Sequence, residues 1–268
     1  MKRRHCRHSA IPRVLKRGLA WMAVLIGGGW VTPCHGNTSP VAAPPILVTN
    51  VAGLAQAAGA DQSVVISLRL DGTVWWADTR RGRLILDDDS GAERLELDVS
   101  AALPKAGARL RLAGDCSVVK TKDAVRLTDV PVVDNDGLHA AAERSGSVYL
   151  TAGRHPIRVG WFNRTDRFAL SVDYEGPGLP RQRTPDAALS HWRVDLHGGA
   201  TNMVGGLDFR CCEGMWWSLL PNFNHLPAVA SGETANFDIG VRTRDEHVGV
   251  QFTGYLEAPG AGRYTFYT

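Results

Sequence analysis

The chain has 268 residues, of which 44% are hydrophobic and 21% charged, a globular composition that excludes a disordered chain, a collagen-like rod and a coiled coil. Its net charge of +3 is uneven, because residues 1–36 hold seven Lys or Arg and no acid, whereas the remainder carries 23 basic and 27 acidic side chains. A mildly acidic body has no general attraction for phosphate backbones, so we expect no nucleic-acid partner.

Residues 1–36 are predicted to be a secretory signal peptide. A basic stretch ends at Arg17, an apolar run covers residues 18–31, and Cys34 and Gly36 provide the small-x-small spacing of a cleavage site. The apolar run is shorter than the ~20 residues of a spanning helix, although an uncleaved anchor is the alternative. We therefore expect a secreted, periplasmic or cell-envelope protein without a stable membrane span after cleavage.

The next two regions are predicted to be a linker and a small barrel. Residues 37–62 are rich in Ala, Pro, Gly and Ser and read as a linker with one short strand at 46–50. In residues 63–123, short β-type runs alternate with turn residues, including turns expected at Asp71-Gly72 and Ser90-Gly91. No window shows a helical period, so these runs predict an antiparallel barrel.

The barrel region contains the run LRLDGTVWWADTRRGRLILDDDSGAERLELD followed by AGARLRLAGDCSVV. It resembles the OB-like modules of exported bacterial proteins, which by fold analogy implies sugar or nucleic-acid ligands. Trp75 and Trp76 are the stacking candidates. Because adjacent strand residues face opposite sides, we expect one indole in the core and the other exposed, where it either stacks on a ligand or packs against a neighbouring domain.

Two later segments carry the motifs of a second family. Residues 124–185 contain DNDGLH, LTAGRHPIRV and YEGPG, with strands expected at 147–150, 157–162 and 168–174, and residues 206–268 contain EGMW, LPNF and FTGYLEAPGAGRYTFY. They resemble, respectively, the C-terminal and N-terminal halves of the protective-antigen-type β-sandwich (PA-fourteen) family. The predicted fold is therefore mainly β: an OB-like barrel followed by an antiparallel sandwich, with residues 186–205 as a polar connector.

The reversed order of the two halves has two explanations. Either the chain is truncated after Thr268 and begins a second sandwich that it does not finish, or residues 124–268 form one circularly permuted sandwich. A half sandwich exposes unpaired strand edges and an apolar face. This cost favours docking of the two halves on each other.

The sandwich resemblance implies a calcium site in its lectin members, formed by two adjacent aspartates. The family's SDDGSRL corresponds here to TKDAVRL, so that Asp123 matches the second aspartate and Lys122 replaces the first. An ammonium at that point counts against calcium-dependent sugar binding. Asp134, Asn135 and Asp136 offer other oxygen ligands, but their spacing does not fit an EF-hand and favours an Asx turn.

Catalytic motifs are missing from the sequence. There is no G-x-S-x-G elbow, H-E-x-x-H helix or P-loop. The cysteines that follow the signal segment (Cys116, Cys211 and Cys212) form at most one bridge or are three reduced thiols, and they lack the spacing of a zinc site.

We therefore expect an exported, non-catalytic binding protein without a cofactor, with calcium as the less favoured alternative. The ligand class that the resemblance implies is a carbohydrate or cell-surface glycan. The alternatives are a structural spacer or assembly module, and the front part of a longer extracellular enzyme.

Overall fold

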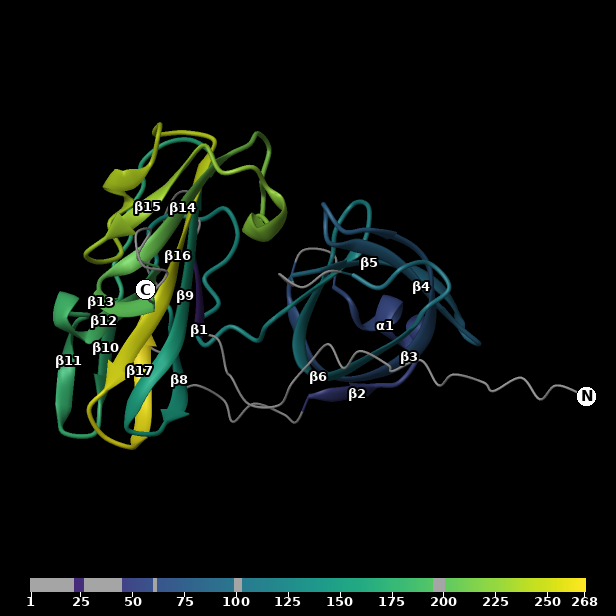
Figure 1. Ribbon diagram of the computed structural model, residues 1–268, viewed down its shortest axis with the longest axis horizontal. Helices are drawn as coiled ribbons and strands as arrows, with labels where there is room; N and C mark the ends of the chain where they lie inside the picture. The colour runs from purple at the N-terminus through teal and green to yellow at the C-terminus, as the bar shows by residue number, and fades with distance from the viewer. Residues whose placement is uncertain (1–21, 27–44, 60–61, 99–102, 195–200) are drawn as a thin grey trace, which may run out of the picture. The chain divides into compact units, whose positions relative to one another are not determined.

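The computed structural model describes residues 22–26, 45–59, 62–98, 103–194 and 201–268 (Figure 1). These residues form two compact units, one ending at Thr128 and one running from Asp129 to Thr268 together with residues 22–26. Each unit has its own hydrophobic core and is mainly β. Apart from residues 22–26, the predicted signal peptide lies outside the described residues.

The first unit is a closed OB-like barrel. Its strands β3, β4, β5, β7 and β6 follow one another around the barrel, and β6 closes on β3. Strands β5 and β7 run parallel, and the remaining neighbours run antiparallel. The strands are β3 (Val64–Asp78), β4 (Arg83–Asp88), β5 (Gly91–Leu97), β6 (Arg109–Lys120) and β7 (Val125–Thr128).

The barrel core follows from the alternation in β3, where Ile66, Leu68 and Leu70 are buried. The turn predicted at Asp71-Gly72 is wrong, because β3 continues through both residues. A side chain at Gly72 would place its Cβ 2.6 Å from the carbonyl oxygen of Asp87 on β4. This glycine therefore allows β4 to pass close to β3 rather than reversing the chain.

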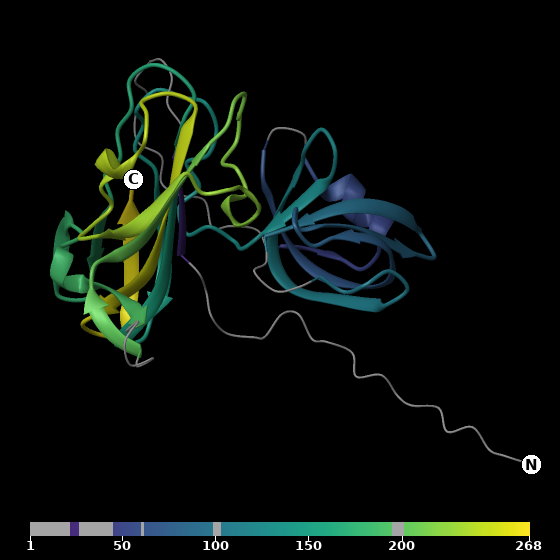
Figure 2. The ribbon, with the colours of Figure 1, turned by 45° about the horizontal axis from the view of Figure 1, so that its top comes forward.

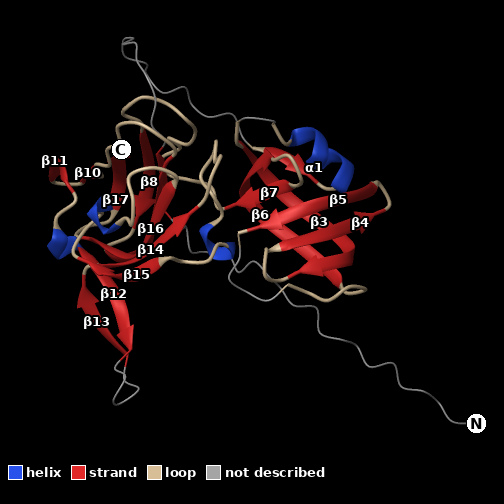
Figure 3. Ribbon diagram, turned by 90° about the horizontal axis from the view of Figure 1, so that it is seen from above, coloured by secondary structure: helices blue, strands red, loops and turns tan. Residues whose placement is uncertain are grey.

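The described part of residues 37–62 contains a strand and a helix, so it is not only a linker. Strand β2 (Ile46–Val48) pairs in parallel with β3, and helix α1 (Val51–Ala57) covers one end of the barrel (Figures 1 and 3). Asn50 caps the helix by accepting a hydrogen bond from the Gly53 amide at 2.7 Å. Seven residues complete only two turns, which explains why no helical period was visible.

The end of the barrel also differs from the prediction. Strand β7 pairs with β5 and β6, so the first unit extends to Thr128 instead of ending at residue 123. The run at 124–127, which the sequence alone could assign to either region, therefore belongs to the barrel, and Val125 and Leu127 are part of its core.

The second unit is a β-sandwich (Figure 2). One sheet contains β1 (Met22–Ile26), β9 (Gly153–Asn163), β16 (Val248–Ala258), β12 (Leu189–Val194), β13 (Thr201–Gly205), β14 (Leu207–Glu213) and β15 (Ala230–Thr234). The other contains β8 (Ser145–Leu150), β17 (Gly262–Tyr267), β10 (Asp173–Gly176) and β11 (Leu179–Arg183). Short 3-10 helices lie at Asp186–Ala188 (η1), Phe223–His225 (η2) and Ile239–Val241 (η3).

Residues 129–185 and 206–268 form a single body. Strand β9 of the first segment pairs with β16 of the second along its whole length, from Gly153 opposite Ala258 to Asn163 opposite Val248. In the other sheet, β17 lies between β8 and β10. One core collects buried side chains from both segments, among them Trp161, Phe252, Tyr264 and Tyr174. Each segment thus covers the apolar face that the other would expose.

Three details of the second unit differ from the sequence expectations. The predicted connector 186–205 contributes β12 and β13, which form a hairpin at the edge of the first sheet. The strand predicted at 168–174 begins only at Asp173, although Phe168 and Leu170 still pack against the core. Strand β1, from the predicted signal segment, pairs in parallel with β9.

Candidate functional site

The barrel presents two adjacent indoles to solvent. Trp75 is 63% exposed and Trp76 45% exposed, so the expectation that one of them is in the core is wrong. The physical reason is a β-bulge: Val74 pairs with Leu86 and Trp76 with Ile85, which leaves Trp75 as an extra residue in β3. A bulge interrupts the alternation of the strand and so places both side chains outside.

Asp123 lies elsewhere on the barrel, in the loop between β6 and β7. Its backbone carbonyl accepts a hydrogen bond from Nη1 of Arg94 on β5 at 3.5 Å. In OB folds the loops after the first and the fourth strand flank the ligand surface, and here these are residues 79–82 and 121–124. Asp123 is thus a loop residue of the barrel, whereas Asp134, Asn135 and Asp136 belong to the second unit.

A second feature of the barrel was missed by the sequence analysis. Asp71 on β3 lies between Arg109 and Arg111 of β6, each of which donates two hydrogen bonds to one carboxylate oxygen, at 2.7–3.0 Å and 2.9–3.2 Å respectively. The hydrogen bonds from Arg109 and then Arg111 hold the pKa of Asp71 below its usual value. The alternating R-x-R pattern at 109–111 was the available signal, but its acidic partner, 38 residues earlier, could not be identified without the register.

Asp134 and Asp136 organise a turn of the second unit. The Asp134 carboxylate accepts the amide of Asp136 at 3.1 Å, the geometry of an Asx turn. The Asp136 carboxylate accepts the amides of Gly137 and Leu220, both at 2.7 Å, and so ties this turn to the second sequence segment. Both carboxylates thus accept backbone hydrogen bonds that shape the loop.

The Asn135 side chain also links two backbone segments by hydrogen bonds. It is 4% exposed, and its Nδ2 donates to the carbonyl of Ala142 at 2.9 Å and to that of Thr268 at 3.4 Å. The His139 ring contacts the Asn135 carbonyl oxygen with Nε2 at 2.8 Å. Asn135 therefore fastens the end of the chain to the 131–144 loop.

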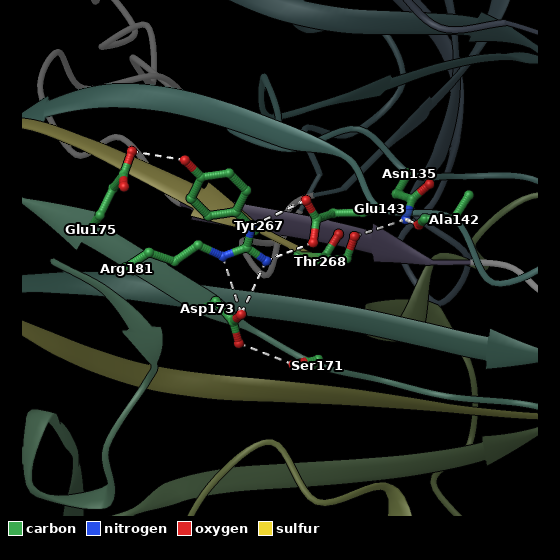
Figure 4. Close-up of polar contacts among 9 residues, drawn as sticks. All are labelled: Asn135, Ala142, Glu143, Ser171, Asp173, Glu175, Arg181, Tyr267 and Thr268. Atoms are coloured by element: carbon green, nitrogen blue, oxygen red, sulfur yellow. Dashed lines mark hydrogen bonds and ion pairs between the residues drawn. The ribbon is translucent and has the colours of Figure 1, made fainter. Parts of the chain in front are cut away.

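Near this chain end, Arg181 is surrounded by acceptors and an aromatic ring (Figure 4). Its guanidinium bonds Glu143 at 2.6 and 3.2 Å and Asp173 at 3.1 and 3.4 Å, and lies 4.0 Å from the ring centroid of Tyr267. The Tyr267 hydroxyl donates to Glu175 at 2.7 Å, which raises the pKa of Tyr267. These charged groups bind one another, which indicates a structural network across β10, β11 and β17.

Sequence reasoning also missed a cluster of strained loop residues. Asp166, Trp216 and His247 have φ of 70°, 68° and 55°, a region that non-glycine residues rarely adopt. Trp216 is 69% exposed, its ring centroid is 6.3 Å from that of His247, and the Arg164 guanidinium lies 5.1 Å from it. Trp216 lies in the EGMW motif, and nothing in that motif indicates that its ring is exposed. This exposed aromatic is the main competitor of the Trp75–Trp76 pair.

The described residues contain few side chains that are suited to metal binding or to thiol chemistry. No group of three or more His, Cys, Asp or Glu side chains there is arranged to hold a metal ion. Cys116, Cys211 and Cys212 are buried and unbridged, which corresponds to the alternative of three reduced thiols, and burial raises the pKa of Cys212. No helix among the described residues is long and apolar enough to cross a bilayer.

Comparison with known protein families, curated proteins and solved structures gives no match to this chain.

Proposed function

We propose that this chain is an exported, non-catalytic binding protein for carbohydrate, with the exposed Trp75–Trp76 pair of the barrel as its binding surface. The observation that carries the proposal is the bulge that turns both indoles outward. Two large aromatic side chains on a rigid strand offer flat apolar faces for sugar rings at low cost in conformational entropy. They precede the loop at 79–82, and in OB folds the loop after the first strand flanks the ligand surface, which supports the proposal.

We propose in addition that the second unit is a protective-antigen-type sandwich whose halves occur in permuted order. The full-length pairing of β9 with β16 and the shared core support this assignment. We do not extend the lectin calcium site of that family to this chain, because Asp123 lies in the barrel and Asp134 and Asp136 accept backbone amides. Sugar binding is therefore expected to be independent of calcium.

The proposal is tested by screening the protein on an array of neutral and acidic glycans, with calcium and with EDTA. Ligands found in this way are titrated against W75A and W76A. We expect each substitution to weaken binding at least ~10-fold, equivalent to about 1.4 kcal/mol. W192A is the matched control, because Trp192 is 50% exposed but lies on β12 of the sandwich.

Three outcomes contradict the proposal. Binding that only W216A abolishes places the site on the sandwich loops. If EDTA abolishes glycan binding, the binding depends on calcium, contrary to the proposal. A protein that binds no glycan on the array favours the spacer or assembly role.

A further inference from the structure

We propose that the outer surface of β3 and β6 binds an acidic polysaccharide, with a sugar carboxylate held by Arg109 and Arg111 and a neighbouring neutral sugar stacked on Trp75. This inference rests on the proposed function and narrows its ligand class. The charged residues involved were not among the sequence-based candidates.

The register places these groups on one face of the barrel. Buried residues alternate along β3 up to Val74, so that Arg69, Asp71, Thr73 and Trp75 are on the outward face. On β6, Arg111 is opposite Asp71 and Arg109 is opposite Thr73. Trp75 lies two residues beyond Thr73, about 7 Å further along the strand. Arg111, Arg109 and Trp75 therefore lie in succession along the outer surface of β3 and β6.

Asp71 prepares the two arginines for an anion. Each guanidinium uses Nε and Nη2 to bind Asp71, which leaves both Nη1 groups unengaged by that carboxylate. One carboxylate between two guanidinium groups leaves one positive charge in excess, and Arg69 adds another two residues away on the same face. Because Asp71 fixes the orientation of both donors, a ligand carboxylate meets them already ordered.

A second acidic residue of the same barrel, Glu96, shows how the Asp71 arrangement differs from a buried ion pair. Glu96 also lies between two arginines, Arg83 and Arg126, but it is buried, and the arginine side chains are only 29% and 18% exposed. The side chains of Arg109 and Arg111 are 67% and 63% exposed. The Glu96 group is enclosed by the protein, whereas the Asp71 group presents its donors to solvent.

The acidic residues around the two arginines limit which kind of anionic polymer can bind there. Asp87 is opposite Thr73 on the β4 side, and Asp115 is opposite Ser67 on β6, so the positive region is short and bounded by carboxylates. A polymer with a charge on every unit, such as a nucleic acid, would meet repulsion beyond the two arginines. A polysaccharide in which uronic acids alternate with neutral sugars matches both the local charge and the indole.

The test is isothermal titration of the protein with hyaluronan octasaccharide, in which glucuronate and N-acetylglucosamine alternate, and with neutral chitin hexamer. Oligo-dT serves as the nucleic-acid probe. We expect hyaluronan to bind more tightly than either, to lose affinity as NaCl is raised, and to bind R109Q and R111Q at least ~10-fold more weakly. R94Q is the matched control, because Arg94 is an exposed arginine of β5 outside this surface, and circular dichroism confirms that each variant is folded.

The inference is overturned if R109Q and R111Q bind hyaluronan like the unaltered protein, or if oligo-dT binds more tightly than hyaluronan. If chitin hexamer binds as well as hyaluronan and only W75A weakens it, carbohydrate binding stands and the acidic ligand class fails. If no saccharide binds in either experiment, the proposed function fails together with the inference.

Discussion

Gly146, at the start of β8, lies against the backbone of the preceding loop. A Cβ on this residue would be 1.6 Å from the carbonyl oxygen of Val132, so any side chain forces the strand and the loop apart. We predict that G146A destabilises the second unit by about 1–3 kcal/mol, measured by urea unfolding.

The control is Gly260, next to the turn between β16 and β17, where a Cβ would meet nothing within 4 Å. G260A is expected to change the free energy of unfolding by less than about 0.5 kcal/mol. Equal effects of the two substitutions would show that the close contact at Gly146 is not formed.

Glu233 on β15 provides a prediction of pH dependence. Its carboxylate accepts a hydrogen bond from Nε of Arg193 at 2.7 Å and lies 3.3 Å from Nε2 of the buried His191. Arg193, and then His191, lower the pKa of Glu233 from 4.5 to about 2. A carboxyl with a lowered pKa in the folded state favours folding above pH 4.5, and this contribution is lost as the pH falls toward 2.

The measurement is a carboxyl ¹³C NMR titration. We expect the Glu233 signal to titrate near pH 2 in the unaltered protein and closer to 4.5 in R193M. R193K retains the positive charge and should give an intermediate midpoint. A midpoint near 4.5 in all three proteins would contradict the ion pair.

Helix α1 illustrates how a short element depends on single contacts. Its N-terminus is held by the Asn50 cap and by the Asp88 carboxylate, which accepts the amide of Val51 at 2.9 Å. Removing the cap leaves a helical amide without its partner. We predict that N50A destabilises the barrel by about 1 kcal/mol in urea unfolding, whereas N50D, which retains an acceptor, stays within about 0.5 kcal/mol of the unaltered protein. A loss of stability in N50D as large as in N50A would show that capping is not the cause.

At the level of elements, the sequence predicts strands well and their interruptions poorly. Alternation locates the first part of β3 and β4, where every second residue is buried, whereas β5 and β9 are located as β-type runs bounded by turn residues. It fails at Gly72, where a glycine needed for close approach looks like a turn signal, and at Trp75, where a bulge breaks the period. It also fails for β12 and β13, whose residues are partly exposed at a sheet edge.

The same limits apply to the candidate sites. Trp75 and Trp76 are recognisable from sequence, but the exposure of both depends on a bulge that only strand register reveals. The Asp71 group joins residues about 40 positions apart, so it depends on the β3–β6 pairing. The Asx turn predicted in this segment is present at Asp134, and the sequence can indicate it because such turns arise from local chemistry, whereas the contact of Asp136 with Leu220 is not local.

At the scale of the whole molecule, two segments that lie far apart in the sequence share one core and one sheet. The 11 register pairs between β9 and β16 join residues about 85–105 positions apart. The core takes its side chains from both segments, so each segment alone would expose apolar residues that the other covers. Burial of this apolar surface is the main force that holds the segments together.

The most direct test of this claim cuts the chain between the two segments. A protease site is inserted at residues 195–200, the purified protein is cleaved there, and the products are analysed by gel filtration with and without urea. We predict that the two fragments elute together as one particle in buffer and separate only in urea, because β9–β16 pairing and the common core survive the cut. Separation of the fragments in buffer would contradict a sandwich built from both segments.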